Sequence, residues 1–359
     1  MTLNFSLAML LALGSLLAES ATLLGQTSKE ESPIANPQPS DDGNPVAYPN
    51  WKIKTLGGKQ FWTDVRYVGG WRIQANSETG HYRLLDPGST RHASGNRTHC
   101  DQMLDQLIVD GKAKPETGKV VIILHGLMRT KSAMQPMAKY LQKNGDFTSI
   151  NLQYASTRNK VGEHAIALQS VIDSLSPKVT EIDFVGHSLG NIVVRRYLGD
   201  HSNSQTGRQA DPRIKRMVML GPPNQGSGMA RFLKSSFTFQ TIAGVSGVEL
   251  SRAWEKLEPT LATPGFEFGI IAGGQENEQK LGNFILKGRD DFTVSVEETK
   301  LAGAHDFLVR PLFHSTMMHQ PEVLKATLSF LQHGYFISDQ ERTPLTQEYT
   351  SDDSRSGRE

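Results

Sequence analysis

The sequence predicts an α/β fold with a doubly wound, mostly parallel sheet, antiparallel entry strands and a small helical cap. The first observation is a set of short runs dominated by apolar residues, typical of buried strands: 120–124, 181–185, 214–220 and 266–272. The second is that stretches with helical spacing of apolar residues alternate with these runs: 132–143, 162–175 and 191–198. Such alternation builds a parallel sheet covered on both faces.

An antiparallel ribbon is expected where the chain enters the domain. Residues 61–68 and 71–74 flank the pair Gly69-Gly70, and 82–85 follow a further turn. Strands separated by so few residues pair antiparallel with their neighbours in the chain. These segments are therefore predicted to form an antiparallel ribbon that precedes the parallel sheet.

Two more strands and a final helix complete the predicted domain. Strand-like segments occur at 147–154 and 306–309, and a helix is predicted at 321–331. Pro321 lies in the first turn of that helix, and Gly334 follows its end. The compact domain is therefore expected to end soon after this helix.

The domain is predicted to span residues 47–336, between two polar segments. Residues 21–46 are rich in proline and too polar to bury a core, which predicts a disordered linker. Residues 337–359 are similarly polar and are predicted to form a disordered tail.

The first segment, residues 1–20, is predicted to be a signal peptide or an N-terminal anchor. Its apolar stretch is about a dozen residues long, which suits a secretory signal and is short for a membrane span. No Lys or Arg precedes Lys29, so an uncleaved anchor is the alternative. Either form predicts export to the periplasm, the cell envelope or the exterior.

The composition is that of an ordinary globular protein. The chain has 359 residues, of which 37% are hydrophobic and 21% charged, and a net charge of +1, which allows one large α/β domain. Basic residues are scattered and provide no field that would attract a nucleic acid. Cys100 is the only cysteine, so an intramolecular disulfide is excluded.

The motif Gly-His-Ser-Leu-Gly at 186–190 follows a predicted strand and precedes a predicted helix. A serine at such a position lies on a tight, strained turn, in which Gly186 and Gly190 provide room that Cβ atoms would fill. The turn exposes the hydroxyl of Ser188 and places the amide of Leu189 at a helix N-terminus, which favours negative charge. The pattern predicts that Ser188 is the nucleophile of an acyl-transfer reaction.

Further motifs stand in a fixed order around this serine: His125-Gly126-Leu127, the segment 220–227 with Pro-Pro-Asn-Gln-Gly-Ser, Asp290-Asp291-Phe292-Thr293-Val294, and His314. With them, residues 115–335 resemble the α/β-hydrolase lipases and esterases, in particular the lipase-like serine hydrolases that carry Gly-His-Ser-Leu-Gly. The resemblance implies an α/β-hydrolase fold and a Ser-Asp-His catalytic triad.

In such hydrolases the oxyanion hole combines the amide after the nucleophile with an amide from the loop after an earlier strand. The resemblance therefore assigns these roles to Leu189 and Leu127. His125 precedes the serine, which makes it a residue that orients this loop rather than the catalytic base. The residues expected to support the elbow and the loop are Gly186, His187, Gly190, His125 and Gly126.

The catalytic acid must follow the serine and precede the base. Asp290, Asp291 and Asp306 satisfy this order. By resemblance, Asp291 stands where these hydrolases place the acid, in a segment that usually reads Asn-Asp-Gly-Thr-Val. Phe292 replaces the usual glycine, so Asp290 and Asp306 stay as alternatives to Asp291.

Four histidines could serve as the base. His305 precedes the last strand, His333 ends the last helix, and His319 adjoins the N-terminus of that helix, where the dipole opposes a positive imidazolium. His314 lies in the loop between the last strand and that helix, where it can reach the serine hydroxyl. It is the predicted base.

Residues 228–264 interrupt the alternation of strands and helices. Their apolar side chains predict helices folded over the serine as a cap, with ordinary core packing as the alternative: Phe232, Leu233, Phe237, Phe239, Ile242, Val245 and Val248. An apolar cap would favour fatty acyl groups.

The predicted function is the hydrolysis of carboxylic esters by a lipase or esterase. Acyl-thioesterase or peptidase activity with the same triad is one alternative, and a non-catalytic binding protein of the same fold is another. The reaction requires no metal, nucleotide or redox cofactor, while a structural calcium ion stays open. The expected partner is a small-molecule or lipid ester, with contact to a membrane surface as an open question.

Overall fold

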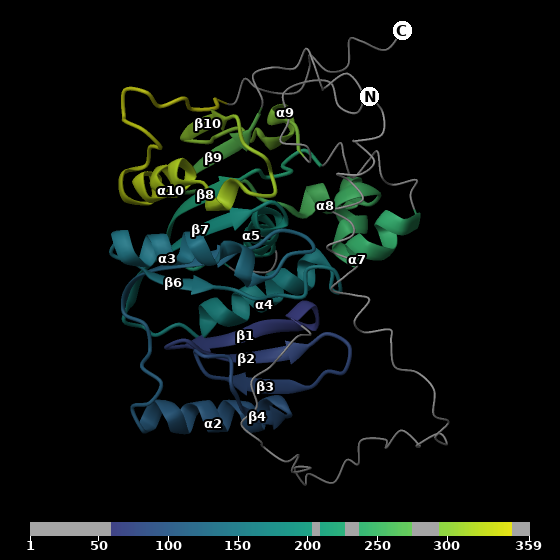
Figure 1. Cartoon of the computed structure of the whole chain (residues 1–359), viewed down its shortest axis with the longest axis vertical. Coiled ribbons are helices and arrows are strands. Elements are labelled where there is room, and N and C mark those ends of the chain that lie inside the picture. The colour runs from purple at the N-terminus through teal and green to yellow at the C-terminus, as the bar shows by residue number, and fades with distance from the viewer. Residues whose placement is uncertain (1–58, 203–208, 227–236, 275–293, 347–359) are drawn as a thin grey trace, which may run out of the picture. The chain divides into compact units, whose positions relative to one another are not determined.

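A computed structural model describes residues 59–202, 209–226, 237–274 and 294–346 of the chain (Figure 1). The predicted signal or anchor at 1–20 and the linker at 21–46 lie outside these residues. The described chain contains a parallel sheet of six strands and an antiparallel sheet of four.

The parallel sheet has the strand order β10-β9-β8-β7-β5-β6. Every neighbouring pair is parallel, so all carboxyl ends meet at one edge. The strands are β5 (Gly118–Leu124), β6 (Thr148–Asn151), β7 (Val179–His187), β8 (Ile214–Leu220), β9 (Glu267–Gly273) and β10 (Asp306–Arg310). The strands predicted from the sequence are all present.

The strand order reverses between β5 and β7. From β5 the chain moves outward to β6 at one edge, and it then returns to β7 on the other side of β5. In open α/β sheets the crevice at the carboxyl ends of such a pair of strands is the usual ligand site. The loop that follows β5 and the turn that follows β7 therefore face the same crevice.

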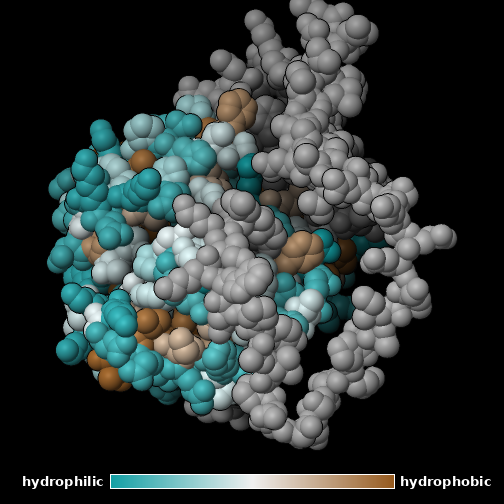
Figure 2. All heavy atoms as spheres, turned by 60° about the horizontal axis from the view of Figure 1, so that its bottom comes forward, coloured by the Kyte–Doolittle hydropathy of each residue, from teal (hydrophilic) through white to brown (hydrophobic). Residues whose placement is uncertain are grey.

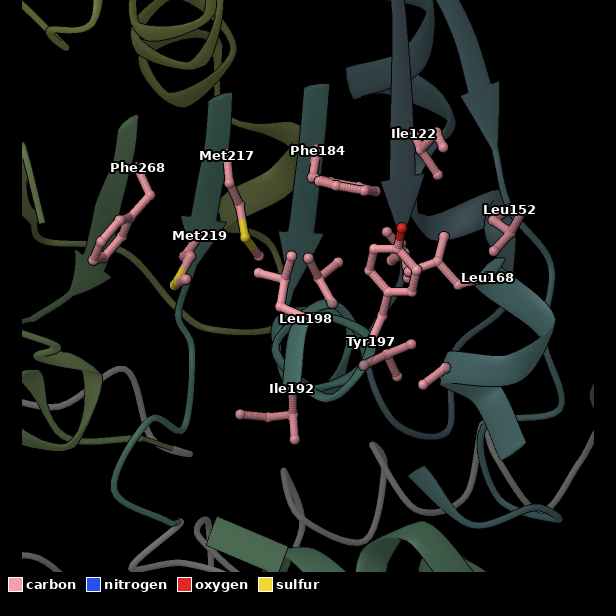
Figure 3. Close-up of a cluster of buried hydrophobic side chains, with 14 of the residues drawn as sticks. Ile122, Leu152, Leu168, Phe184, Ile192, Tyr197, Leu198, Met217, Met219 and Phe268 are labelled. Carbon is pink, nitrogen blue, oxygen red and sulfur yellow. The ribbon is translucent and has the colours of Figure 1, made fainter. Parts of the chain in front are cut away.

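Helices cover both faces of this sheet. One face packs against α4 (Val161–Asp173) and α5 (Leu189–Asp200), and Figure 3 shows apolar side chains of that layer. The other face packs against α3 (Gln135–Asn144) and α10 (Pro321–His333). Alternate residues of β5 pack into one helical layer and then the other. The sheet is therefore buried on both faces, as predicted.

The predicted antiparallel entry strands are present, and they form a sheet of their own. Four strands pair in sequence: β1 (Trp62–Val68), β2 (Trp71–Asn76), β3 (Tyr82–Leu85) and β4 (Arg91–Gly95). This sheet meets the segment after β6 through Asp64, whose amide donates to the Gln153 carbonyl at 2.8 Å and whose carboxylate accepts from the Gln153 amide at 2.8 Å.

Helix α2 (Arg97–Val109) and strand β4 were not predicted. Strand β4 lacks an apolar run, and α2 buries few of its residues, so the periodic signal is weak in both. A local signal for α2 exists in Asn96, whose side chain accepts from the His99 amide at 2.8 Å as an N-cap. Figure 2 brings this part of the molecule forward and shows a largely hydrophilic face with small apolar spots.

The predicted disordered tail is corrected for residues 337–346, which pack on the domain. The Asp306 carboxylate accepts from the amides of Phe336 at 2.8 Å and Thr343 at 2.9 Å. Leu345 is buried, and its amide donates to the Ala304 carbonyl at 2.9 Å. The buried Asp306 carboxylate requires hydrogen-bond donors, and backbone amides provide them. These bonds hold residues 337–346 on the domain although their composition is polar.

The predicted cap contains α7 (Phe237–Ser251), α8 (Trp254–Leu257) and the 3-10 helix η3 (Glu258–Thr260); its first part lies outside the described residues. Gly244 interrupts α7 at φ 63°, and a Cβ there would stand 1.8 Å from the Thr157 carbonyl oxygen. The Val245 amide donates to that carbonyl at 3.0 Å. The second half of α7 is therefore fixed on the loop after β6, at the carboxyl edge of the sheet.

Part of this segment packs as ordinary core, since Leu250 and Trp254 join the core cluster of α4 and α5. Within the described residues, no helix is long and apolar enough to cross a bilayer.

We expect Asp183→Asn to remove a pH-dependent destabilisation. Burial, followed by the charge of Glu181, raises the pKa of Asp183 to about 8. Between the unfolded and folded pKa values the folded protein keeps a proton that the unfolded chain releases, so the stability of the native protein falls as pH rises. The Asn side chain still offers the oxygen that accepts from the Arg216 amide at 2.9 Å.

Urea unfolding of both proteins at about pH 5 and about pH 8 measures this effect. The free energy of unfolding of the variant relative to the native protein should rise by at least about 1 kcal/mol over this interval. A difference that stays constant with pH would contradict the buried, protonated state of Asp183.

Candidate active site

Ser188 forms a strained turn between β7 and α5. Its backbone adopts φ 51° and ψ −118°, a region that non-glycine residues rarely enter. Its amide donates to the Leu220 carbonyl at 2.9 Å, which ties the turn to the end of β8. The strain is thus held by the surrounding sheet, at the carboxyl edge where the strand order reverses.

Two glycines make this turn sterically feasible. A Cβ at Gly186 would stand 2.3 Å from the Asn191 side-chain oxygen, and one at Gly190 would stand 2.7 Å from the Leu124 carbonyl oxygen. The Asn191 amide group also donates to the Ser188 carbonyl at 3.1 Å. Backbone and side chains therefore approach so closely that only glycine fits at both positions.

The loop after β5 lies directly against this turn. A Cβ at Gly126 would stand 3.1 Å from the Ser188 Cβ and 2.8 Å from His187 Nδ1. Met128 adopts φ 58°, and the Arg129 amide donates to the Gly126 carbonyl at 3.3 Å, which makes a tight turn. The absence of a side chain at Gly126 thus allows the loop to reach the serine.

His125 orients this loop. Its Nδ1 donates to the Gly126 carbonyl at 2.9 Å, and its Nε2 accepts a long hydrogen bond from the Tyr154 amide at 3.5 Å. Its ring stacks on Tyr154 with centroids 4.1 Å apart, and the Tyr154 hydroxyl donates to the His125 carbonyl. Burial lowers the pKa of His125 to about 4, so near pH 7 the ring is neutral and these contacts assign its proton to Nδ1.

The bond from His125 sets the direction of the Leu127 amide. In a trans peptide the carbonyl and the N–H point in opposite directions. Because the Gly126 carbonyl points toward His125, the N–H of Leu127 points away from it. Among the described residues this N–H has no hydrogen-bond acceptor.

His314 lies in the loop that follows β10 and contacts the residue before Ser188. It is buried, and its ring lies 4.7 Å from the ring of His187, centroid to centroid. Its carbonyl accepts a hydrogen bond of 2.9 Å from His187 Nε2. Gly221, at φ 51°, lies so close that a Cβ would stand 2.8 Å from His314 Nδ1.

The three other histidines lie elsewhere. His305 precedes β10 at the amino ends of the strands, and its amide donates to the Phe268 carbonyl at 2.8 Å. His319, in the 3-10 helix η4 (Met317–His319), donates through Nε2 to the Ala133 carbonyl at 2.8 Å. His333 ends α10, where its ring stacks on Tyr335.

Of the three acid candidates, Asp290 and Asp291 lie outside the described residues. Asp306 begins β10, so it lies at the amino edge of the sheet, opposite Ser188. Its two oxygens are occupied by backbone amides, including that of Phe307 at 2.9 Å. The structure thus excludes Asp306 from the site and gives it a role in holding the C-terminal segment.

A buried arginine that the sequence did not predict to have a role lies on the helix that follows the serine turn. Arg195 of α5 donates to the Asn224 side-chain oxygen at 3.0 Å and to the Ala262 carbonyl at 3.0 Å. The Asn224 amide group donates to the carbonyl of Thr299, the last residue of α9 (Val296–Thr299), at 2.7 Å. Burial lowers the pKa of Arg195 to about 10. The turn predicted around Asn224 is therefore also a connection between the elbow helix and α9.

One family model matches the chain. Residues 114–220 match the family described as "Putative serine esterase (DUF676)", a range that runs from just before β5 to the end of β8. The chain has an α/β-hydrolase fold. Together with the strained serine turn, the match over residues 114–220 indicates a serine esterase-like hydrolase. No curated protein matches the chain.

Solved structures of bacterial hydrolases are similar at low identity. The lipase BlEst2 of Bacillus licheniformis, in its mature form, is 18% identical over 62% of this chain and 94% of its own, with a TM-score of 0.42. Est1E of Butyrivibrio proteoclasticus is 15% identical over 61% of this chain and 89% of its own, with a TM-score of 0.40. Phospholipase PlaB of Legionella pneumophila is 16% identical over 61% of this chain and 57% of its own, with a TM-score of 0.43.

We expect Gly221→Ala to displace His314, because the new methyl group would stand 2.8 Å from its Nδ1. Gly80→Ala is the matched control, since Gly80 has φ 67° and nothing within 4 Å of the new Cβ. Both variants introduce left-handed backbone strain of about 1–2 kcal/mol. Only Gly221→Ala should slow the reaction of Ser188 with a fluorophosphonate, by about tenfold or more. Equal rates in the two variants would contradict the packing of His314 on Gly221.

Proposed function

We propose that the protein hydrolyses carboxylic esters with a triad of Ser188, His314 and Asp291. The observation that supports this most is the convergence of three separate segments on one strained serine. The loop at Gly126 lies against the Ser188 Cβ, and the loop at His314 packs on Gly221, which directly follows the residue that binds the Ser188 amide. A nucleophile, a base and a loop with a free amide are the parts that acyl transfer requires.

In the first step His314 takes the proton of the Ser188 hydroxyl while the oxygen attacks the ester carbonyl carbon. The carbonyl π electrons move to its oxygen, and the amides of Leu127 and Leu189 stabilise that negative charge. The tetrahedral intermediate then expels the alcohol, which leaves with the proton from His314. Asp291 orients the imidazole and stabilises its charged form.

In the second step water attacks the acyl-enzyme. His314 accepts a proton from the water, the acyl bond to Ser188 breaks, and the serine oxygen recovers the proton as the carboxylic acid is released. His125 does not exchange protons in this scheme. Its low pKa keeps it neutral, and its single proton holds the Gly126 carbonyl.

The surroundings of the site support a substrate with an apolar part. Phe313, beside the base, is 51% exposed, and α7 lies at the same edge of the sheet as the serine. An exposed aromatic ring and an apolar cap suit an acyl chain, including one presented by a lipid surface. Export, as proposed from the N-terminal segment, would bring the enzyme to such substrates.

Ser188→Ala should abolish both fluorophosphonate labelling and the hydrolysis of a nitrophenyl butyrate. Ser170→Ala is the control, since Ser170 lies on α4 and its hydroxyl donates to the Ile166 carbonyl at 3.0 Å. The loss of kcat on removal of a nucleophile is on the order of 10⁶. Labelling that survives Ser188→Ala would contradict the proposed nucleophile. A native protein that neither labels nor turns over esters would favour a binding protein of this fold.

Asp291→Asn should lower kcat by on the order of 10³–10⁴, because the base loses its orienting and charge-balancing partner. Asp290→Asn is the matched control and should change kcat by less than about tenfold. Steady-state kinetics with the same ester measure both variants. A larger loss in Asp290→Asn would move the acid to the neighbouring position.

A further inference from the structure

His187 lies between the elbow glycine and the nucleophile, and its side chain reaches the base. It is 2% exposed and lies under Gly126, whose missing Cβ would stand 2.8 Å from His187 Nδ1. On its other side, Nε2 is 2.9 Å from the carbonyl oxygen of His314, 127 positions further along the chain. The residue that precedes Ser188 thus directly contacts the backbone of the proposed base.

The protonation of His187 follows from its partners. A carbonyl oxygen can only accept, so Nε2 must carry a proton. Within the part of the chain that the structure describes, Nδ1 is buried without a hydrogen-bond partner. Burial, followed by the charge of His314, lowers the pKa of His187 well below its usual range. His187 is therefore neutral, with its single proton on the atom that binds His314.

We propose that His187 is a positioning residue, which holds the backbone of His314 at the distance from Ser188 that proton transfer requires. This inference rests on the proposed function. The bond joins the nucleophile turn to a loop outside the regular elements, between β10 and η4. The position of a loop is less fixed by secondary structure than that of a strand or helix. A hydrogen bond to the end of β7 therefore restrains the loop that holds His314.

The neutral state of His187 also suits the reaction. His314 becomes positively charged when it takes the serine proton, and a second charge on His187 would oppose this step across rings 4.7 Å apart. A neutral ring donates its hydrogen bond without such repulsion. The other charged or titratable groups that bear on His187 are Arg129 and His125, and both disfavour its protonation.

The test compares His187→Gln, which keeps an N–H donor at a similar reach, with His187→Leu, which has none. In His187→Leu we expect kcat to fall by about 10–100-fold with little change in KM, because a misplaced base affects the chemical step rather than binding. His187→Gln should keep kcat within about threefold of the native value. Native kcat in His187→Leu, or equal losses in the two variants, would overturn the proposal.

His201→Leu is the control for loss of a buried histidine bond. His201 Nδ1 donates to the Tyr197 carbonyl at 2.7 Å at the end of α5, and the residue is buried. Its replacement should leave kcat within about twofold of the native value. If His187→Leu fails to fold, His187→Asn replaces it, because the shorter amide cannot reach the His314 carbonyl. Equal kcat in the Asn and Gln variants would then overturn the proposal.

Amide hydrogen exchange of residues 312–316 separates this inference from the proposed function. Release of the loop should accelerate exchange in His187→Leu or His187→Asn but not in His187→Gln, whether or not the protein cleaves esters. Unchanged exchange in all variants would overturn the role of His187 even if Ser188 reacts with a fluorophosphonate. An inactive native protein would instead overturn only the proposed function.

Discussion

The site depends on the close approach of three backbone segments at the carboxyl ends of β5, β7 and β8. Gly126, Gly186, Gly190 and Gly221 stand where a Cβ would come within 2.3 to 2.8 Å of a neighbouring atom. At such distances any larger residue would force a neighbouring atom to move. This packing and the hydrogen bond from the Ser188 amide to the end of β8 together hold the backbone of Ser188 in its strained conformation.

Burial then determines how the histidines around the serine behave. His125 and His187 are both kept neutral by desolvation, and each uses its single proton to hold a carbonyl, at Gly126 and at His314. A charged ring at either place would be unfavourable in so apolar an environment. His125 therefore supports the loop at Leu127, and His187 supports the loop at His314.

The outer parts of the domain secure the same edge of the sheet. The antiparallel sheet meets the segment after β6 through Asp64 and Gln153, and α7 is fixed on the loop that follows it. On the other side, Arg195 and Asn224 connect the elbow helix to α9. The contacts of Asp64 with Gln153 and of Arg195 with Asn224 are polar and buried, so each is strong only when every partner is present.

The sequence by itself determined the parallel strands, the helices between them and the serine turn. These features follow from local signals: apolar periodicity, a proline or glycine at a helix end, and glycines at fixed spacing. Tertiary structure decided that the entry strands form a separate sheet and that residues 337–346 pack on Asp306. It also decided that His314 packs against Gly221 and that His187 binds the His314 carbonyl. The reason is that these contacts join residues far apart in the chain, and neither residue alone carries a signal of its partner.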